Sequence, residues 1–333
     1  MISFQPPPFA PHRLYRGGHL QTLAAVASKK KNEFSGIPHV VSLSDGDAVV
    51  LHENCPQAWS EGDPMLLLVH GLCGCHAAPY MIRLASQFVA KGFRVFRIDM
   101  RGCGAAFDLA EQLTHAGRGG DLVAALDYIA SLTPRSRLGV IAVSLGGNQL
   151  LGSLGRIGAG TDSRPDWFER LQRVAVVSPP IDLLRCSENM QRIRMWPYNY
   201  YFIRQLLSRV PPRVKQRADF QEQILKRRPR TLYDLDDQLT APLSGFDTAR
   251  DYYREASASN HVATNPVATL VLVAADDPVV PVDCFDKSIR SWPSTTKVYV
   301  SKHGGHVGFI DRNRNCWMDR ALGHWFEGTA VGR

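Results

Sequence analysis

The sequence has no long apolar run. One of its long uncharged stretches, residues 138 to 155, contains Ser, Asn, Gln and several Gly, whereas a membrane-spanning helix needs about 20 predominantly apolar residues. The first residues also lack the continuous apolar stretch of a secretory signal peptide, because three consecutive prolines stand at positions 6 to 8. We therefore expect no membrane span and no secretion by that route.

Cysteine is scarce and irregularly spaced. The seven cysteines are odd in number and form no regular pattern, which argues against a disulfide framework and favours a reducing compartment. We therefore expect a cytoplasmic protein. The cluster of His70, Cys73, Cys75 and His76 lacks paired CxxC spacing and has no second half downstream, so the sequence predicts no metal site there.

Overall composition is ordinary. Of the 333 residues, 44% are apolar and 21% are charged, values typical of a packed globular protein rather than of a disordered chain. The length would allow two average domains, but one α/β domain with an enlarged connection reaches the same size. The simplest interpretation is one domain with one large insertion.

Short apolar segments recur along the chain. Ile37 to Leu43 and Ala48 to Glu53 flank the turn dipeptide Asp45-Gly46 and predict an antiparallel hairpin. The later segments are continuously apolar, as expected of strands covered on both faces, and amphipathic helical stretches separate them. The pattern predicts an α/β fold, in which the N-terminal hairpin leads into a mostly parallel central sheet with helices on both faces. The later predicted strands are Met65 to Val69, Arg94 to Ile98, Leu138 to Val143, Val174 to Val177, Thr269 to Ala274 and Lys297 to Val300.

One connection is far longer than the others. About ninety residues separate the predicted strand 174–177 from the next one, whereas such folds usually connect their elements with about 2 to 6 residues. We expect residues 179–265 to form a helical cap over the carboxyl edge of the sheet. Residues 37–178 and 266–333 then make up the α/β core, and residues 1–36 form an N-terminal extension that packs on it.

Ser144 follows directly after a predicted strand and precedes a helical pattern, which is the context of a nucleophile elbow. Such a turn brings strand and helix backbones close together, so it needs small residues two before and two after the serine. Ala142 and Gly146 occupy these positions, with alanine in place of the usual glycine. We interpret Ser144 as a nucleophile; the alternative is a buried turn serine in a strand-to-helix connection.

The loop after the predicted strand 65–69 reads His-Gly-Leu-Cys-Gly. A glycine-rich turn can direct backbone N–H groups at a developing oxyanion, and the amide after the nucleophile supplies a second donor. Leu72 and Leu145 are therefore the candidate oxyanion-hole residues. His70 precedes a glycine at a strand end, and we interpret it as structural rather than as a base.

Two later loops at strand ends carry a carboxylate and an imidazole. We choose Asp277 as the acid because the proline after it stiffens the turn, with Asp276 and the weaker Asp182 as alternatives. His306 follows two glycines, whose mobile backbone lets its imidazole reach both partners, so we choose it as the general base over His303. The order along the chain is then serine, aspartate, histidine.

Several short motifs accompany these candidates. They are Gly18-His19-Leu20-Gln21-Thr22, His70-Gly71-Leu72, Met100-Arg101-Gly102-Cys103-Gly104, Ser144-Leu145-Gly146-Gly147-Asn148, Thr231-Leu232-Tyr233-Asp234-Leu235-Asp236-Asp237, Ala241-Pro242, Gly245-Phe246, Asp251-Tyr252-Tyr253, Asp276-Asp277-Pro278 and Gly304-Gly305-His306. Over nearly the whole chain they resemble the YheT-like branch of the α/β-hydrolase superfamily, which is akin to animal abhydrolase-domain lipid hydrolases and yeast ethanol acyltransferases. The resemblance implies an α/β-hydrolase fold and a triad of Ser144, Asp277 and His306. It also implies carboxylic-ester hydrolase, phospholipase or alcohol acyltransferase activity, and Ala142 is its one departure.

The motifs together predict a carboxylesterase or lipase-like serine hydrolase that acts on a small-molecule or lipid ester through an acyl-enzyme, without metal or organic cofactor. An acyltransferase, in which an alcohol replaces water, is the close rival. A non-catalytic scaffold is disfavoured because every catalytic position is filled. A dinucleotide-binding oxidoreductase is set aside, since Gly102-Cys103-Gly104 lacks the third glycine of GxGxxG.

Positive charge gathers in the predicted cap. The chain carries a formal net charge of +8, and residues 192–230 contain eleven Lys or Arg against Asp219 and Glu222. One interpretation is peripheral contact of this basic cap with an anionic membrane or an anionic substrate; the other is a solvated helical face. No recognition module for nucleic acid accompanies the charge, so no nucleic acid partner is expected.

Overall fold

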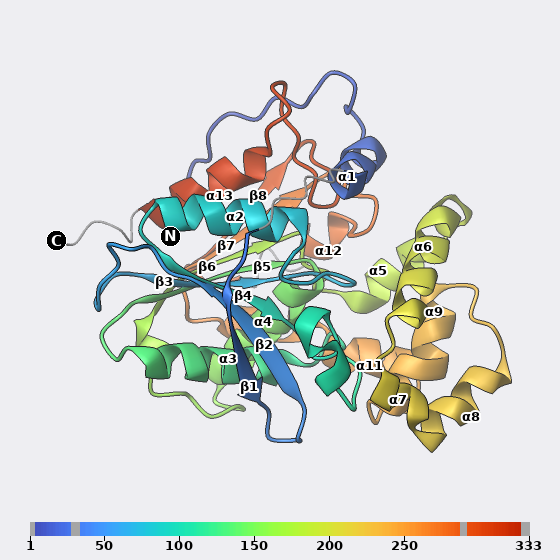
Figure 1. The fold of residues 1–333 in the computed structure, drawn as a ribbon. Coiled ribbons are helices and arrows are strands. Elements are labelled where there is room, and N and C mark those ends of the chain that lie inside the picture. Colours follow the sequence, from blue (N-terminus) through green and yellow to red (C-terminus); the bar gives the residue numbers. More distant parts are fainter. Residues whose placement is uncertain (1–3, 28–33, 287–291, 328–333) are drawn as a thin grey trace.

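The computed structural model describes residues 4–27, 34–286 and 292–327, and its centre is one sheet of eight strands in the order β1-β2-β4-β3-β5-β6-β7-β8 (Figure 1). The pairs β1–β2 and β2–β4 are antiparallel, and every later pair is parallel. This arrangement confirms the predicted hairpin and mostly parallel sheet. The strands are β1 Ile37–Ser42, β2 Ala48–Asn54, β3 Met65–Val69, β4 Arg94–Asp99, β5 Leu138–Val143, β6 Leu171–Val177, β7 Thr269–Ala274 and β8 Thr296–Ser301.

The predicted strands match the observed ones with small differences at their ends. The largest difference is at β6, which begins at Leu171 rather than at Val174. Leu171 pairs with Leu138 across a shift in register, and the exposed Gln172 and half-buried Arg173 interrupt the apolar run. Because polar residues interrupt the apolar run near the start of this strand, the sequence pattern did not indicate the first residues of the strand.

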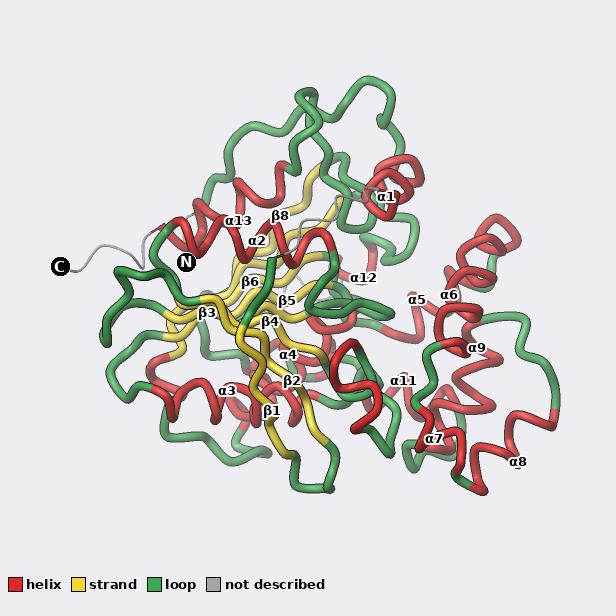
Figure 2. Tube along the Cα trace, in the orientation of Figure 1, coloured by secondary structure: helices red, strands yellow, loops and turns green. Residues whose placement is uncertain are grey.

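Helices cover both faces of the sheet (Figures 1 and 2). They are α2 Pro79–Ala90 and α13 Trp317–Glu327 on one face, and α3 Gly119–Leu132 and α4 Leu145–Ala159 on the other. Side chains of a strand alternate between its two faces. In β3, Leu66 and Leu68 accordingly pack in the apolar cluster of α2 and α13, whereas Leu67 and Val69 pack in that of α3 and α4. The sheet is thus buried on both sides, as its continuous apolar runs predict.

Residues 178–268, between β6 and β7, form short helices; those from α6 to α9 lie beyond the sheet (Figure 1), whereas η5 and η6 pack in the apolar cluster of α3 and α4. Seven apolar side chains of these helices and their connections form a small cluster of their own around Val214 and Phe220. The division into core and cap at residues 179 and 265 stays a prediction. The helices are α5 Leu183–Met190, η3 Ile193–Met195, α6 Trp196–Ser208, α7 Pro212–Gln216, α8 Ala218–Lys226, α9 Leu232–Leu235, the π-helix η4 Asp236–Thr240, α10 Ala241–Leu243, α11 Ala249–Ala256, η5 Ala258–Asn260 and η6 Val262–Thr264.

The remaining elements are short. The N-terminal extension contributes α1, and within the described part of the chain no helix is both long and apolar enough to cross a membrane. Parts of the predicted extension (residues 1–3 and 28–33) and of the predicted core (residues 287–291 and 328–333) lie outside the described residues. These elements are α1 Gly18–Ala27, η1 Gly104–Leu109, η2 Phe168–Arg170 and α12 Asp283–Asp286.

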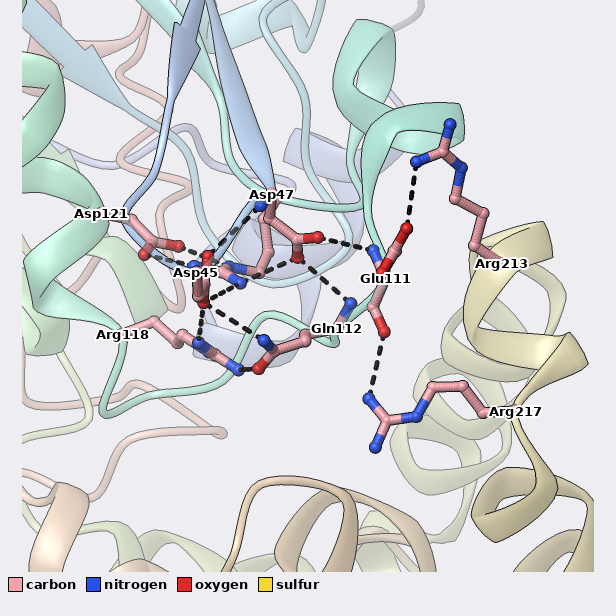
Figure 3. A network of polar contacts seen from close by, with 9 residues as sticks. Asp45, Asp47, Glu111, Gln112, Arg118, Asp121, Arg213 and Arg217 are labelled. Atoms are coloured by element: carbon pink, nitrogen blue, oxygen red, sulfur yellow. Dashed lines mark hydrogen bonds and ion pairs between the residues drawn. The ribbon is translucent and has the colours of Figure 1, made fainter.

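A buried ion network ties the N-terminal hairpin to the core (Figure 3). The Arg101 side chain, only 2% exposed, donates to both carboxylate oxygens of Asp121 and to Asp45 and Asp47 at 2.8 to 2.9 Å. Asp47 also accepts from the Glu111 amide, at 2.7 Å. Because the charges are paired and hydrogen-bonded, their burial is tolerated, and the hairpin turn is fixed to the end of β4 and to α3.

The same network extends to the helices beyond the sheet edge. The Glu111 carboxylate lies 3.3 Å from the guanidinium of Arg213 in α7 (Figure 3). The backbone carbonyl of Glu111 accepts a hydrogen bond from Arg217 at 3.1 Å. Both arginines are substantially exposed, so each contact is worth no more than about 1 kcal/mol. The network therefore anchors the hairpin strongly and the outer helices weakly.

Replacing Arg101 with methionine tests this anchor. The substitution leaves Asp47 and Asp121 buried without their cation, and removing one partner of a buried pair costs about 3–5 kcal/mol. We expect the free energy of unfolding, measured by urea denaturation, to fall by that amount. Arg164→Met is the matched control, since the Arg164–Glu169 pair is exposed and its loss should cost less than about 1 kcal/mol. Equal losses for the two variants would contradict the proposed role of Arg101.

Candidate active site

Ser144 occupies a strained turn between β5 and α4. Its backbone has φ 51° and ψ −119°, a conformation that L residues rarely adopt, and its amide donates to the Val177 carbonyl at 2.8 Å. A Cβ on Gly146 would lie 2.6 Å from both the His70 carbonyl oxygen and Val69, so this position cannot carry a side chain. Ala142 is fully buried and keeps to a single methyl group. The turn therefore has the close packing of a nucleophile elbow.

His306, on the loop after β8, connects two other predicted residues. Its Nε2 lies 3.0 Å from Ser144 Oγ, and its Nδ1 lies 2.9 Å from Asp277 Oδ2. The other carboxylate oxygen of Asp277 accepts from the amides of Val279 and Val280. The Asp277 side chain is 1% exposed and that of His306 is 12% exposed, so the chain of contacts is shielded from bulk water.

The alternative candidates lie nearby but contact other groups. Asp276 accepts from the Gly305 amide at 2.9 Å and lies 3.3 Å from Nδ1 of His303. Asp182 caps the amino end of α5 by accepting from the Arg185 amide. Of the two histidines and three aspartates considered from the sequence, the structure thus brings His306 and Asp277 into line with the serine.

The predicted oxyanion-hole residues line the same cavity as Ser144. Leu145 is the first residue of α4, where backbone amides have no partner within the helix. Leu72 lies in the loop after β3, and its side chain packs against the apolar cluster that contains Leu145. Both amides are therefore candidates to face a developing negative charge beside Ser144.

His70 fixes the loop that contains Leu72. Its Nδ1 donates to the Gly71 carbonyl at 2.8 Å, and its Nε2 accepts from the Met100 amide at 3.2 Å. Burial lowers the pKa of His70 below its ordinary value, so the imidazole is neutral and can accept as well as donate. The Gly71 amide in turn donates to the hydroxyl of Tyr80. These contacts join the loop to the end of β4 and to α2.

Among the described residues, one group of side chains consists of the residue types that bind metal ions. His52, His76 and Asp99 place ligand atoms within 4.8 Å of one another. The two imidazoles are stacked with ring centroids 3.5 Å apart and planes 15° apart, and both hydrogen-bond to the same Asp99 oxygen, His52 Nε2 at 3.0 Å and His76 Nδ1 at 2.6 Å. Cys73, a neighbour of this group in the loop, is kept protonated because burial raises its pKa to about 11. The three side chains hold the loop after β3 to the end of β4.

A cavity of about 1040 Å³ opens beside Ser144 and His306. Its walls come from the loop after β3, from α1 and from the helices between β6 and β7, and most of the side chains that line it are apolar or aromatic. A volume of this order accommodates a ligand of drug or lipid size. Wall residues include Leu72, Leu183, Met190, Tyr201, Phe202 and Leu206.

Asp236 is an ionisable group in this apolar wall that sequence reasoning missed. It begins the π-helix η4, and its Oδ2 accepts from the Tyr253 hydroxyl at 2.7 Å. Burial raises the pKa of Asp236 to about 6. The motif Thr231-Leu232-Tyr233-Asp234-Leu235-Asp236-Asp237 contains it, but a π-helix has no distinct sequence pattern that would have singled it out.

The sheet order, the strained serine turn and the loops that carry Asp277 and His306 at one sheet edge define the architecture of an α/β hydrolase. The family model described as "Alpha/beta hydrolase family" matches residues 66–316, and the chain belongs to this family. Among solved structures, Est1E from Butyrivibrio proteoclasticus has a TM-score of 0.57 and 14% identity, covering 90% of this chain and 100% of that one. At this identity the likeness shows the fold.

Sequence relatives agree with the resemblance to the YheT-like branch. YheT of Escherichia coli K12 is 26% identical over 322 residues, which cover 95% of this chain and 92% of that protein. "Medium-chain fatty acid ethyl ester synthase/esterase 2" of Saccharomyces cerevisiae is 28% identical over 79% of this chain, and "Phospholipase ABHD3" of Mus musculus is 28% identical over 78%. The matched parts span 62% of each of these last two proteins.

The buried carboxyl of Asp236 predicts a specific dependence of stability on pH. An acid whose pKa rises from 3.8 to about 6 on folding binds its proton more tightly in the folded state, so stability falls as the pH rises through this range. Asp236→Asn does not ionise and still offers an acceptor to Tyr253. Relative to the wild type, we expect this variant to gain about 1–3 kcal/mol between pH 4 and pH 8, the lower end applying if cavity water screens the charge. Urea denaturation across this range measures the gain, and a difference independent of pH would contradict it.

Proposed function

We propose that the protein is a serine hydrolase that cleaves carboxylic esters through an acyl-enzyme, with Ser144 as nucleophile, His306 as general base and Asp277 as the orienting acid. The observation that carries the proposal is the unbroken chain of contacts from Ser144 Oγ through the imidazole to the buried carboxylate, at 3.0 and 2.9 Å. These lengths are those of hydrogen bonds able to transfer a proton. The chain ends at a large apolar cavity, which supplies room for an ester.

The reaction follows from the positions of these groups. Nε2 of His306 takes the proton of Ser144 as the hydroxyl oxygen attacks the ester carbonyl, and Asp277 stabilises the imidazolium that forms. The amides of Leu72 and Leu145 bind the oxyanion of the tetrahedral intermediate. His306 then gives its proton to the departing alcohol, which leaves the acyl group on the serine. Water activated by the same imidazole releases the acid and restores the enzyme.

The apolar cavity favours esters with a hydrocarbon acyl chain, because burial of each methylene group contributes about 0.8 kcal/mol. The names of two relatives describe a phospholipase and an ethyl ester synthase/esterase, which keeps two specific alternatives open for this chain. In acyl transfer, an alcohol attacks the acyl-enzyme in place of water. Ester formation with added ethanol, measured beside hydrolysis over esters of graded chain length, separates these reactions and defines the acyl preference.

Substitutions at the three proposed catalytic positions test the mechanism. Ser144→Ala should leave the fold intact, abolish labelling by a fluorophosphonate probe and lower ester turnover by about 10⁴ or more. Asp277→Asn and His306→Ala should each lose most activity, because the imidazole is then misoriented or absent. Labelling that persists in Ser144→Ala would exclude this serine as the nucleophile.

The neighbouring residues supply matched controls for these variants. Asp276→Asn and His303→Ala remove side chains of the same types from the same two loops, but these side chains contact each other and the Gly305 amide rather than Ser144. Both controls should keep substantially more activity than Asp277→Asn and His306→Ala. The reverse pattern would transfer the acid and base roles to the neighbours.

We also propose that the basic cap binds anionic lipid. The geometry favours the rim of the cavity as the surface that contacts the lipid. His19 in α1 lies 3.0 Å from the hydroxyl of Tyr198 in α6, so these two helices meet where both line the cavity. Close to Tyr198 in the sequence, Ile193 and Trp196 are 91% and 62% exposed, and Arg194 beside them is exposed. Apolar and aromatic side chains with adjacent arginines suit the interface of an anionic bilayer.

Vesicle co-sedimentation tests this contact. Replacing Ile193 and Trp196 with serine should weaken binding to anionic liposomes by about thirtyfold or more, since each of the two buried apolar side chains contributes about 1 kcal/mol or more. Leu225→Ser is the matched control, because Leu225 is 81% exposed on α8, far from α1 (Figure 1). High salt should weaken binding because ions screen the surface potential, which decays within about 8 Å even at physiological ionic strength. Equal binding to neutral and anionic liposomes, or none at low salt, would exclude the proposal.

A further inference from the structure

Helix α1 lies directly against the two loops that carry the proposed acid and base. A Cβ on Gly18 would lie 1.6 Å from the Asp276 carbonyl oxygen, and one on Gly305 would lie 2.3 Å from the Gly18 carbonyl oxygen. Such distances leave no room for a methyl group on either glycine, so the backbones touch. The stretch Gly18-His19-Leu20-Gln21-Thr22 therefore sits beside the proposed catalytic residues, although the mechanism above gives it no role.

Thr22 makes a hydrogen bond to the backbone of His306 itself. Its hydroxyl accepts from the His306 amide at 2.8 Å and donates to the Gly18 carbonyl at 2.7 Å. The second bond fixes the direction of the hydroxyl, so that a lone pair faces the histidine amide. Thr22 is buried, with 6% of its surface exposed, and it lines the cavity beside Ser144.

Gln21 holds the other end of the same loop. Its Oε1 accepts from the Ile310 amide at 2.7 Å, and its Nε2 donates to the carbonyls of Ile310 at 3.1 Å and Tyr15 at 2.7 Å. The carboxamide is completely buried and uses both its oxygen and its nitrogen. Adjacent side chains of one helix thus bracket residues 306–310.

The bracketed loop has a backbone that needs such support. Val307 and Phe309 have φ of 64° and 46°, in the left-handed region that β-branched and bulky residues rarely adopt. A Cβ on Gly308 would lie 2.6 Å from the Gln21 carbonyl oxygen, so the loop packs directly against the backbone of α1. Strained conformations of this kind persist only where the surroundings fix them.

We infer that Gln21 and Thr22 are positioning residues, which set the place of His306 relative to Ser144 and Asp277. This inference rests on the proposed function, because it assigns these two side chains a part in that reaction. Neither side chain contacts the serine or the aspartate in the hydrogen bonds described above, so both act through the loop. Their removal should change the rate of the chemical step more than the binding of the ester.

Thr22→Val removes the hydroxyl while keeping the shape of the side chain. We expect kcat for a p-nitrophenyl ester, and the rate of fluorophosphonate labelling, to fall about tenfold or more with KM changed less than about twofold, since small misplacements of reacting groups cost up to about a hundredfold. Thr22→Ser restores the hydroxyl and should recover the activity. Gln21→Leu, which acts at the far end of the loop, should resemble Thr22→Val.

Thr269→Val is the matched control for the loss of a buried threonine hydroxyl. Thr269 is fully buried at the amino end of β7, the opposite end from the site, and donates to the Val267 carbonyl at 2.8 Å. This variant should unfold at a lower temperature and keep the wild-type kcat. If Thr22→Val and Gln21→Leu behave like Thr269→Val, losing stability but not kcat, the inference is wrong.

Amide hydrogen exchange of residues 304–310 gives a second readout that needs no activity. Thr22→Val should raise exchange in this segment at least about tenfold, because the His306 amide loses its buried acceptor, whereas Thr22→Ser should not. If the wild-type protein reacts with neither fluorophosphonate nor esters, the proposed function is wrong. Hydrogen exchange would then still measure whether α1 holds the loop. Unchanged exchange in Thr22→Val would overturn the inference in either case.

Discussion

The close approach of β5 and α4 at Ser144 is the constraint on which the rest of the site depends. The backbone of the serine has φ 51°. A Cβ on Gly146 would lie 2.6 Å from both the His70 carbonyl oxygen and Val69. The contact that forbids a side chain at Gly146 therefore also brings the loop after β3 beside the serine. Two backbone segments, one carrying Leu72 and one beginning α4, meet at a single point because nothing larger than glycine separates them.

Parallel strands supply the other half of the arrangement. The strands from β3 to β8 all end at one edge of the sheet, so the loops after β5, β7 and β8 open side by side. Asp277 and His306 come from the last two of these loops and reach Ser144 in the first. The sheet, buried on both faces, is rigid enough to hold the strained serine turn and the loop of Asp277 in a defined geometry.

The sequence was informative where a function depends on local pattern. The turn dipeptide Asp45-Gly46 located the hairpin, continuous apolar runs located the later strands, and small residues around Ser144 marked the turn, because these properties belong to a few consecutive residues. Thr22 and His306 are 284 positions apart, and Asp236 owes its raised pKa to burial by the surrounding helices. No periodicity or motif spacing encodes such contacts. The motif at residues 18–22 was visible in the sequence, but its contacts with residues 306 and 310 follow only from the three-dimensional structure.

The loop of His306 depends on a contact with the beginning of the chain. The eight strands lie between residues 37 and 301, and their ladders bring the loops of Ser144 and Asp277 to the same end of the sheet. The loop of His306 follows the last strand, contains strained backbone and is bracketed by two side chains from the beginning of the chain. Its geometry thus depends on a contact between segments near the two ends of the chain, whose closure carries the entropy cost of a long loop. We therefore expect a substitution in α1 to displace the proposed base while the core remains folded.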